Sequence, residues 1–257
     1  MILKAIFKFF NPLVVYIPFV FGITKIFEMI LGYQNIWNSL WNQIVLYLGQ
    51  DELTYVVCLP NLIFLALSLG LGWVYNILDV LDAPKCLTKY RLNELTNNNK
   101  KIDLFKVSMN VLQNNLLNPI MTISTFYLCK KFISYEFKLE APSFFILIRD
   151  LSFYIIVQDI FTFYIHRLLH NPIFYKYHKK HHQMKPTRAL NAIRFDFFDY
   201  FFANYIPFII GMIIHHPHVA TGILWSIITS FTSTTIHCGY GFPSFYCIQF
   251  HNDHHLK

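Results

Sequence analysis

The chain has 257 residues, of which 55% are hydrophobic and only 14% are charged. A soluble domain usually carries about 25% charged residues, so this composition excludes an ordinary soluble protein and indicates an integral membrane protein. The formal net charge of +7 would suit a nucleic-acid-binding protein, but the basic residues lie in loops beside apolar runs. Positive charge in that position sets membrane topology and contacts anionic lipid. We therefore expect a membrane partner and no nucleic acid.

Four apolar stretches follow one another along the first part of the chain. They are residues 11–24, 55–78, 107–128 and 144–165. Asn114, Asn115 and Asn118 dilute the third stretch, and Arg149 and Asp159 interrupt the fourth. A bilayer core requires about 20 residues of helix, and each stretch comes near that length. The pattern predicts about four transmembrane helices, of which the first is an uncleaved signal anchor.

Basic residues are distributed unevenly between the loops. The loop 32–54 contains no Lys or Arg, whereas the loop 82–106 and the residues after His166 are rich in both. Cytosolic loops carry an excess of Lys and Arg, so the loop 82–106 is predicted to lie inside. Two further crossings then return the chain to the cytosolic side at His166.

A last apolar stretch covers residues 203–236, with the polar sequence HHPH in its middle. A single crossing there would put the histidines before and after it on opposite faces of the membrane. Two full crossings need about 40 residues, more than the stretch provides. We therefore predict a re-entrant helical hairpin that turns at residues 215–218.

Histidines gather at the end of the fourth apolar stretch. The sequence HRLLH puts His166 and His170 four residues apart, so that both lie on one face of the helix. Asn171 and Pro172 then end this helix, because the residue before a proline is steered away from α-helical geometry.

Two further histidine groups repeat the spacing HxxHH. The first group is His178, His181 and His182, and the second is His251, His254 and His255, with His237 in HCGY between them. On a helix, His178 can share a face with both His181 and His182.

Together these histidines indicate a metal centre. Neutral imidazole binds iron, zinc, copper and nickel. So many imidazoles packed together without metal would leave buried ring nitrogens without hydrogen-bond partners. Eight or nine ligands exceed what one ion accepts, so two ions are implied. The expected fold class is all-α: a polytopic membrane helical protein with about four transmembrane helices, a re-entrant hairpin and a cytosolic His-rich di-metal site.

The order of these motifs resembles the fatty acid hydroxylase/sterol desaturase superfamily. The resemblance rests on QDIFTFYIHRLLH, YHKKHH, HCGYGFP and HNDHHLK and covers about residues 142–257. Within the superfamily, these stretches are most similar to the fatty acid hydroxylase domain-containing protein 2 group and the C-4 methylsterol oxidases.

The resemblance implies a di-iron oxidoreductase that uses O2 to oxidise C–H bonds of a lipid, with a sterol as the favoured substrate. Electrons would come from NAD(P)H through cytochrome b5 or a reductase, and the site would face the cytosol at the endoplasmic reticulum membrane. The implied iron ligands are His166, His170, His178, His181, His182, His237, His251, His254 and His255.

Two carboxylates are candidates for supporting these ligands. Asp159 lies two helical turns before His166, where it could accept a hydrogen bond from a ligand or pair with Arg149. Asp196 begins the sequence DFFD, where the resemblance implies a His-Pro-x-Glu stretch. Asp196 would then replace that histidine.

These observations divide the chain into N-terminal transmembrane helices, residues 1–141, and a histidine-box catalytic domain, residues 142–257. We expect the domain to be truncated, because the resemblance implies a further stretch after the last histidine group. A fatty-acyl hydroxylase, a sterol desaturase or a catalytically inactive metal-binding membrane protein would share the same ligands. A zinc transporter is disfavoured, because transporters place their ligands near the bilayer midplane within paired repeats.

Overall fold

The computed structural model describes residues 32–93, 104–130, 138–242 and 246–256. Within these ranges the chain is helical, and its one pairing of extended backbone is an isolated antiparallel bridge between Arg91 and Tyr240. The all-α expectation is therefore confirmed for the part of the chain that the structure describes. The first predicted apolar stretch, residues 11–24, lies outside it.

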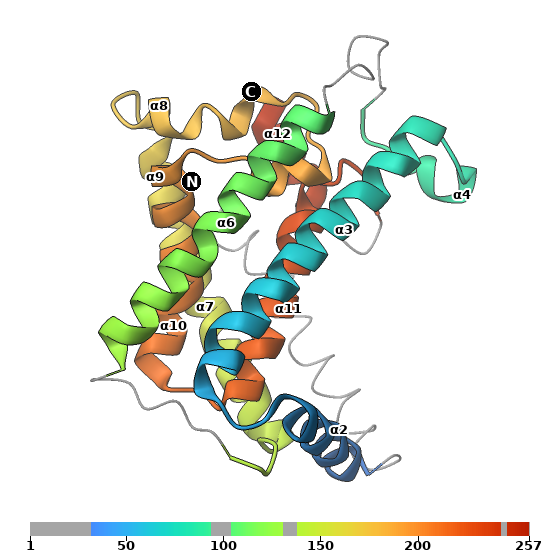
Figure 1. Cartoon of the computed structure of the whole chain (residues 1–257). Helices are drawn as coiled ribbons and strands as arrows, with labels where there is room; N and C mark the ends of the chain where they lie inside the picture. The colour runs from blue at the N-terminus through green and yellow to red at the C-terminus, as the bar shows by residue number, and fades with distance from the viewer. Residues whose placement is uncertain (1–31, 94–103, 131–137, 243–245, 257) are drawn as a thin grey trace.

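The long helices run side by side along one axis of the molecule (Figure 1). They are α3 (Leu59–Leu81), which continues a π-helical turn η1 (Thr54–Cys58), α6 (Leu104–Cys129), α7 (Phe144–Leu169), α10 (Ile206–His215) and α11 (Val219–Ile236). Successive helices run in opposite directions, so the last residues of α3, α7 and α11 lie at one end of the bundle (Figure 1).

Short helices mark the two ends of this bundle. One end carries α4 (Lys85–Thr88), α8 (Tyr175–His178) and α12 (Tyr246–Leu256), and we call it the site end (Figure 1). The opposite end carries α2 (Tyr33–Leu48) and the turn between α10 and α11, and we call it the far end (Figure 1). The segments that hold the predicted ligands therefore lie together at the site end.

Three continuous helices among the described residues are long and apolar enough to cross a membrane: Thr54–Leu81, Phe197–His215 and Val219–Ile236. Helices α6 and α7 fill the third and fourth predicted stretches at 26 residues each, but they are too polar to meet the same criterion. Two of their polar residues make tertiary contacts. Asn114 of α6 donates to the carbonyl oxygen of Ile193 at 2.6 Å, and Asp150 of α7 binds His215 at 2.8 Å.

The hairpin begins earlier than the sequence indicated. Its first arm starts at Phe197, through α9 (Phe197–Asp199) and the π-helical η4 (Tyr200–Tyr205), and not at Ala203. The two arms are therefore 19 and 18 residues long, close to the roughly 20 that cross a bilayer. The first arm includes Asp199, whose side chain is completely buried. The argument from length against two full crossings was therefore wrong.

Local signals position the ends of α7 as expected. The hydroxyl oxygen of Ser143 accepts a hydrogen bond from the backbone N–H of Ile146, which caps the start of the helix. The helix ends at Leu169, directly before His170 and the Asn171-Pro172 pair, which confirms the predicted end. His166 and His170 are thus mounted on the last turn of a long helix at the site end.

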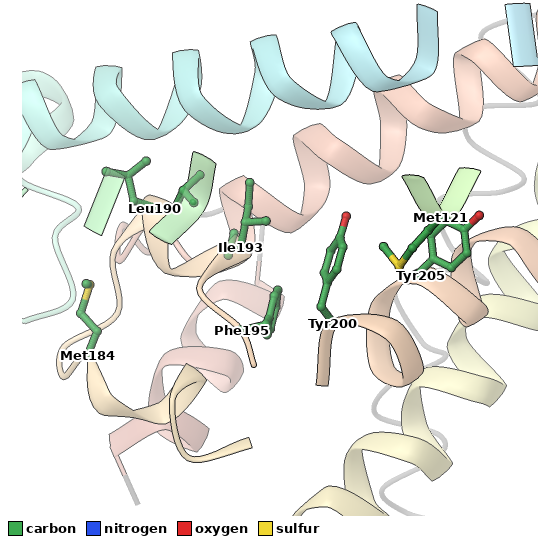
Figure 2. Packing of buried hydrophobic residues seen from close by; sticks show 9 residues of the cluster. Met121, Met184, Leu190, Ile193, Phe195, Tyr200 and Tyr205 are labelled. Carbon is green, nitrogen blue, oxygen red and sulfur yellow. The ribbon is translucent and has the colours of Figure 1, made fainter. Parts of the chain in front are cut away.

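A hydrophobic layer supports the segment that follows the second histidine group. Figure 2 shows Leu190, Ile193 and Phe195 of this segment, with Tyr200 next to Phe195 and Met121 farther along, beside Tyr205. The short 3-10 helix η3 (Ala189–Ile193) packs against α3, α6 and α11. Gly72 of α3 allows the closest approach, because a Cβ atom there would collide with the side chain of Leu190.

We predict that Gly72→Ala lowers the free energy of unfolding by roughly 1–3 kcal/mol, the usual cost of overpacking a core. Leu190 is only 1% exposed and has little room to yield. The matched control is Gly70→Ala in the same helix, where no neighbouring atom lies within 4 Å. That change should be neutral or stabilising, because glycine inside a helix costs about 0.5–1 kcal/mol relative to alanine. Denaturant unfolding in detergent measures both, and equal stabilities would contradict this packing.

Candidate metal centre

Nine histidines converge at the site end in two clusters. The first, which we call the open cluster, contains His166, His170, His178, His182 and His254. The second, which we call the enclosed cluster, contains His181, His237, His251 and His255. Within each cluster, one nitrogen from every ring lies within 4.8 Å of the others. The structure thus brings together all nine residues that the sequence singled out.

The HxxHH spacing divides each histidine group between the two clusters. The first and last histidines of a group share a cluster: their Nε2 atoms are 3.0 Å apart for His178 and His182, and also for His251 and His255. The middle histidine belongs to the other cluster, because neighbouring residues on a helix point about 100° apart. The expectation that His178 shares a face with both later histidines was therefore wrong for His181.

The ring nitrogens face one another closely in the open cluster. The Nε2 atoms of His166, His170 and His254 form a triangle with sides of 2.8, 3.1 and 3.2 Å. A neutral imidazole has a single N–H, so each Nε2 atom is either a hydrogen-bond donor or an acceptor. Three Nε2 atoms in such a triangle therefore cannot all be hydrogen-bonded to one another. A cation at the centre would satisfy all three lone pairs.

The enclosed cluster has the same character. The Nε2 atom of His237 lies 3.2 Å from that of His181 and 2.7 Å from that of His251. Its four rings come from three separate parts of the chain: the 3-10 helix η2 (His181–Gln183), the end of α11 and the helix α12. The donor set of each cluster therefore fits a metal ion that prefers imidazole nitrogen.

Hydrogen bonds on the outer side of two rings orient them toward the clusters. His178 Nδ1 lies 2.8 Å from the Oδ2 of Asp199, and both side chains are buried. His237 Nδ1 lies 2.8 Å from the backbone oxygen of Ser233, one helical turn earlier. In each case the Nδ1–H donates outward, which leaves the Nε2 lone pair facing the other histidines.

Burial also keeps the rings neutral. It lowers the pKa of His182 to about 3 and that of His237 to about 4, with the charge of His178 adding to the effect in both. The pKa of His181 is lowered well below its ordinary value by complete burial and by His237 nearby. These three rings are therefore unprotonated at neutral pH, which is the form that binds metal.

The predicted supporting carboxylates lie in other surroundings than expected. Asp196 caps α9, where its Oδ1 accepts a hydrogen bond from the backbone N–H of Phe198. The contact with a histidine is made by Asp199, which the sequence argument missed. The signal was present, since Asp199 occupies the glutamate position of the His-Pro-x-Glu stretch that the resemblance implied.

Asp159 is half-buried on α7 and makes no hydrogen bond or ion pair with any residue of the described ranges. Arg149, the alternative partner considered for it, pairs with Asp150 instead, at 2.7 Å. The supporting role of Asp159 stays a prediction.

The two clusters differ in access. A cavity of about 490 Å³ opens beside the open cluster and is lined by His170, Pro172, Tyr175, His182 and His254. His170 itself is exposed, whereas His181, His237 and His255 of the enclosed cluster are buried. A small molecule can therefore reach the open cluster from outside the protein.

Residues 151–257 match the model of the fatty acid hydroxylase family, and this range contains all nine histidines. This part of the chain is therefore similar to the fatty acid hydroxylase family. Over 233 residues the chain is 24% identical to human fatty acid hydroxylase domain-containing protein 2, which covers 86% of this chain and 67% of that protein.

Two other relatives carry more specific names. The chain is 28% identical over 143 residues to methylsterol monooxygenase 1 of Gallus gallus, which covers 52% of this chain and 48% of that protein. It is 31% identical over 102 residues to the fatty acid hydroxylase ahd1 of Mycosarcoma maydis, which covers 39% of this chain and 27% of that protein. No solved structure matches the chain.

We predict that Asp199→Asn weakens metal binding by roughly 10–100-fold, the usual cost of losing the hydrogen-bond partner of a metal ligand. The amide keeps the size of the side chain but loses the negative charge beside His178. Asp196→Asn, three residues earlier, is the matched control, because asparagine caps a helix as well as aspartate does. Titration of the metal-free protein with Fe(II) measures both variants, and equal affinities would show that Asp199 does not support the centre.

We also predict that acid destabilises the metal-free protein. The folded state holds His181, His182 and His237 below their ordinary pKa, so the unfolded chain binds more protons as the pH falls. The loss of stability should begin near pH 6.5, the pKa of an unperturbed histidine, and continue down toward the lowered values of the folded state. Thermal unfolding between pH 8 and pH 4 tests this. A midpoint that does not change across the range would contradict neutral, buried clusters.

Proposed function

We propose that this protein is a membrane-bound, di-iron, O2-dependent lipid hydroxylase or oxidase that acts on a sterol-type substrate. The observation that carries the proposal is the pair of histidine clusters at the ends of long apolar helices. The match of residues 151–257 to the fatty acid hydroxylase family model supports the reaction class. The alternatives with the same ligands are separated by the lipid that is oxidised.

All nine histidines are proposed as the metal ligands, five in the open cluster and four in the enclosed one. Two iron ions held there would supply the oxidising power, drawn from O2, that cleavage of an unactivated C–H bond requires. Asp199 and the backbone oxygen of Ser233 would hold two of the rings in the metal-binding tautomer. Burial of the enclosed cluster would exclude water from that side of the centre.

The membrane arrangement follows from the antiparallel helices. We propose that α6 and α7 cross the bilayer together with α3, so that the site end faces the cytosol at the endoplasmic reticulum. The hairpin of α10 and α11 returns the chain to the cytosolic side. This holds whether the turn lies within the bilayer, as in a re-entrant hairpin, or on the far side of it. Exposed Arg167, Lys176 and Lys179 at the site end agree with the excess of basic residues on cytosolic loops.

Electrons would have to come from a partner. The chain contains no glycine-rich nucleotide fingerprint, so NAD(P)H would act through cytochrome b5 or a reductase. The accessible side of the centre is the open cluster, beside the cavity lined by His170 and Tyr175. We propose that the donor approaches from this cytosolic side, whereas the lipid substrate arrives from the bilayer.

The sterol assignment is supported by the methylsterol monooxygenase relative, and a fatty-acyl substrate is supported by the relative ahd1. The two assignments differ in what accumulates when the enzyme is missing. A sterol oxidase leaves unoxidised methylsterols behind, whereas an acyl hydroxylase leaves chains that lack a hydroxyl group.

The test is turnover by the purified protein in lipid vesicles supplied with iron, O2, NAD(P)H, cytochrome b5 and its reductase. A 4-methylsterol and a very-long-chain fatty-acyl lipid are offered in separate vesicles. We expect O2-dependent oxidation of the sterol, and its complete loss in the double variant His181→Ala, His182→Ala. The control is His216→Asn at the far end, an exposed histidine with a φ of 29° that asparagine accommodates.

Oxidation of the acyl chain alone would overturn the sterol assignment and keep the reaction class. No oxidation of either lipid, by a protein that contains iron, would contradict the enzymatic proposal itself.

A further inference from the structure

A polar cluster joins the end of α3 to the loop that follows α11. Asp79, on the last turn of α3, has a side chain that is only 7% exposed. Its Oδ1 accepts hydrogen bonds from the hydroxyl of Tyr240 at 2.6 Å and from Nε of Arg91 at 3.3 Å. Arg91 Nη2 also donates to the Tyr240 hydroxyl at 3.1 Å, so the three side chains contact one another. Tyr240 is completely buried, and burial together with Asp79 raises its pKa, so that it remains a hydrogen-bond donor.

The backbones of the same two segments are paired. The N–H of Leu92 donates to the oxygen of Gly239 at 3.0 Å, and the N–H of Gly241 donates to the oxygen of Tyr90 at 2.7 Å. Gly239 has a φ of 78°, and a Cβ atom there would lie 2.9 Å from the backbone oxygen of Thr187. Only glycine fits this position without strain, which indicates that the pairing fixes the path of the chain after His237.

The next residue of this segment reaches the last helix. Asn93 Nδ2 donates to the Oδ1 of Asn252 at 2.9 Å, and the hydroxyl of Thr187 donates to the same oxygen at 3.0 Å. Asn252 is 2% exposed and follows His251 directly in α12. One turn earlier, Ile248 is completely buried in a cluster with Tyr240 and Cys238. The contacts of residues 79–93 therefore extend to the helix that carries the last histidine group.

We propose that residues 79–93, which we call the clamp segment, position α12 for metal binding. The inference rests on the proposed di-metal centre. The clamp segment lies outside the region that matches the family model, and none of its residues is in either histidine cluster. It would act through Tyr240 and Asn252 on the direction of α12, and so on three histidines at once.

The two clusters depend on α12 to different degrees. The enclosed cluster takes His251 and His255 from α12, half of its four histidines, whereas the open cluster takes only His254 of its five. A shift of α12 should therefore weaken the enclosed cluster strongly and the open cluster little. General loosening of the fold would weaken both clusters alike, so this asymmetry distinguishes positioning from mere stability.

The experiment uses the full-length protein in detergent, stripped of metal and titrated with Co(II), whose visible absorption reports on its ligands. Asn93→Ala removes one hydrogen bond to Asn252, and Asp79→Asn removes the charge at the centre of the polar cluster. Lys85→Gln is the matched control, because this exposed lysine of the same segment pairs with Asp82 and with no other side chain among the described residues. Thermal unfolding of each metal-free variant measures stability separately.

We expect the native chain and Lys85→Gln to bind two cobalt ions. In Asn93→Ala and Asp79→Asn, the ion in the open cluster should bind as in the native chain. The ion in the enclosed cluster should bind at least 10-fold more weakly, which is the usual effect of losing a residue that supports a metal ligand. Two unchanged affinities in Asn93→Ala, or an equal loss at both sites, would overturn the positioning role. Asn93→Ala decides the question if Asp79→Asn does not fold. A native chain that binds no cobalt would contradict the proposed metal centre itself.

Discussion

Nine imidazole rings meet at one end of the helical bundle, with nitrogen atoms 2.7–3.2 Å apart, and they are compatible only if nearly all of them are neutral. Protonated rings at these distances would repel one another. Neutral rings have too few N–H donors for all of the facing nitrogen atoms to be hydrogen-bonded. Burial reduces the first difficulty by lowering the pKa of His181, His182 and His237. Metal ions would resolve the second by accepting the lone pairs that remain. The surrounding structure serves to keep these rings buried and turned inward.

Polar residues within the apolar helices help to form this environment. Asn114 of α6 would be costly in lipid, but its side chain donates a hydrogen bond to the backbone oxygen of Ile193. This contact holds the segment that contains Phe195, whose ring stacks on His181 with the ring centroids 4.5 Å apart. Asp199 lies in the first arm of the apolar hairpin and binds His178. Asn114 and Asp199 weaken the hydropathy signal of their helices, and both support segments that carry clustered histidines.

The sequence singled out the nine histidines that meet at the site end, because the patterns that mark them are local. Histidines at i and i+4 share a helical face wherever the helix lies, and a proline ends α7 whatever packs against it. The family resemblance added the order of the groups and the ninth histidine, His237. All nine residues meet in the folded chain.

The remaining features are decided by contacts between distant parts of the chain, for which the sequence gives at most a partial local signal. His181 and His182 belong to different clusters because His237, His251 and His255 lie around His181, whereas His254 lies beside His182. The role of Asp199 in place of Asp196 depends on which turn of the hairpin faces α8. The contact between Asp79 and Tyr240 joins residues 161 positions apart. Tertiary packing decided each of these, and it also moved the start of the hairpin to Phe197.

The central claim is that the two histidine clusters hold two separate ions, and native mass spectrometry of the detergent-purified protein tests it most directly. The account predicts two bound iron ions in the native chain and one in His181→Ala, because that histidine belongs to the enclosed cluster alone. A native chain that carries one ion or none, or a His181→Ala variant that still carries two, would contradict the account.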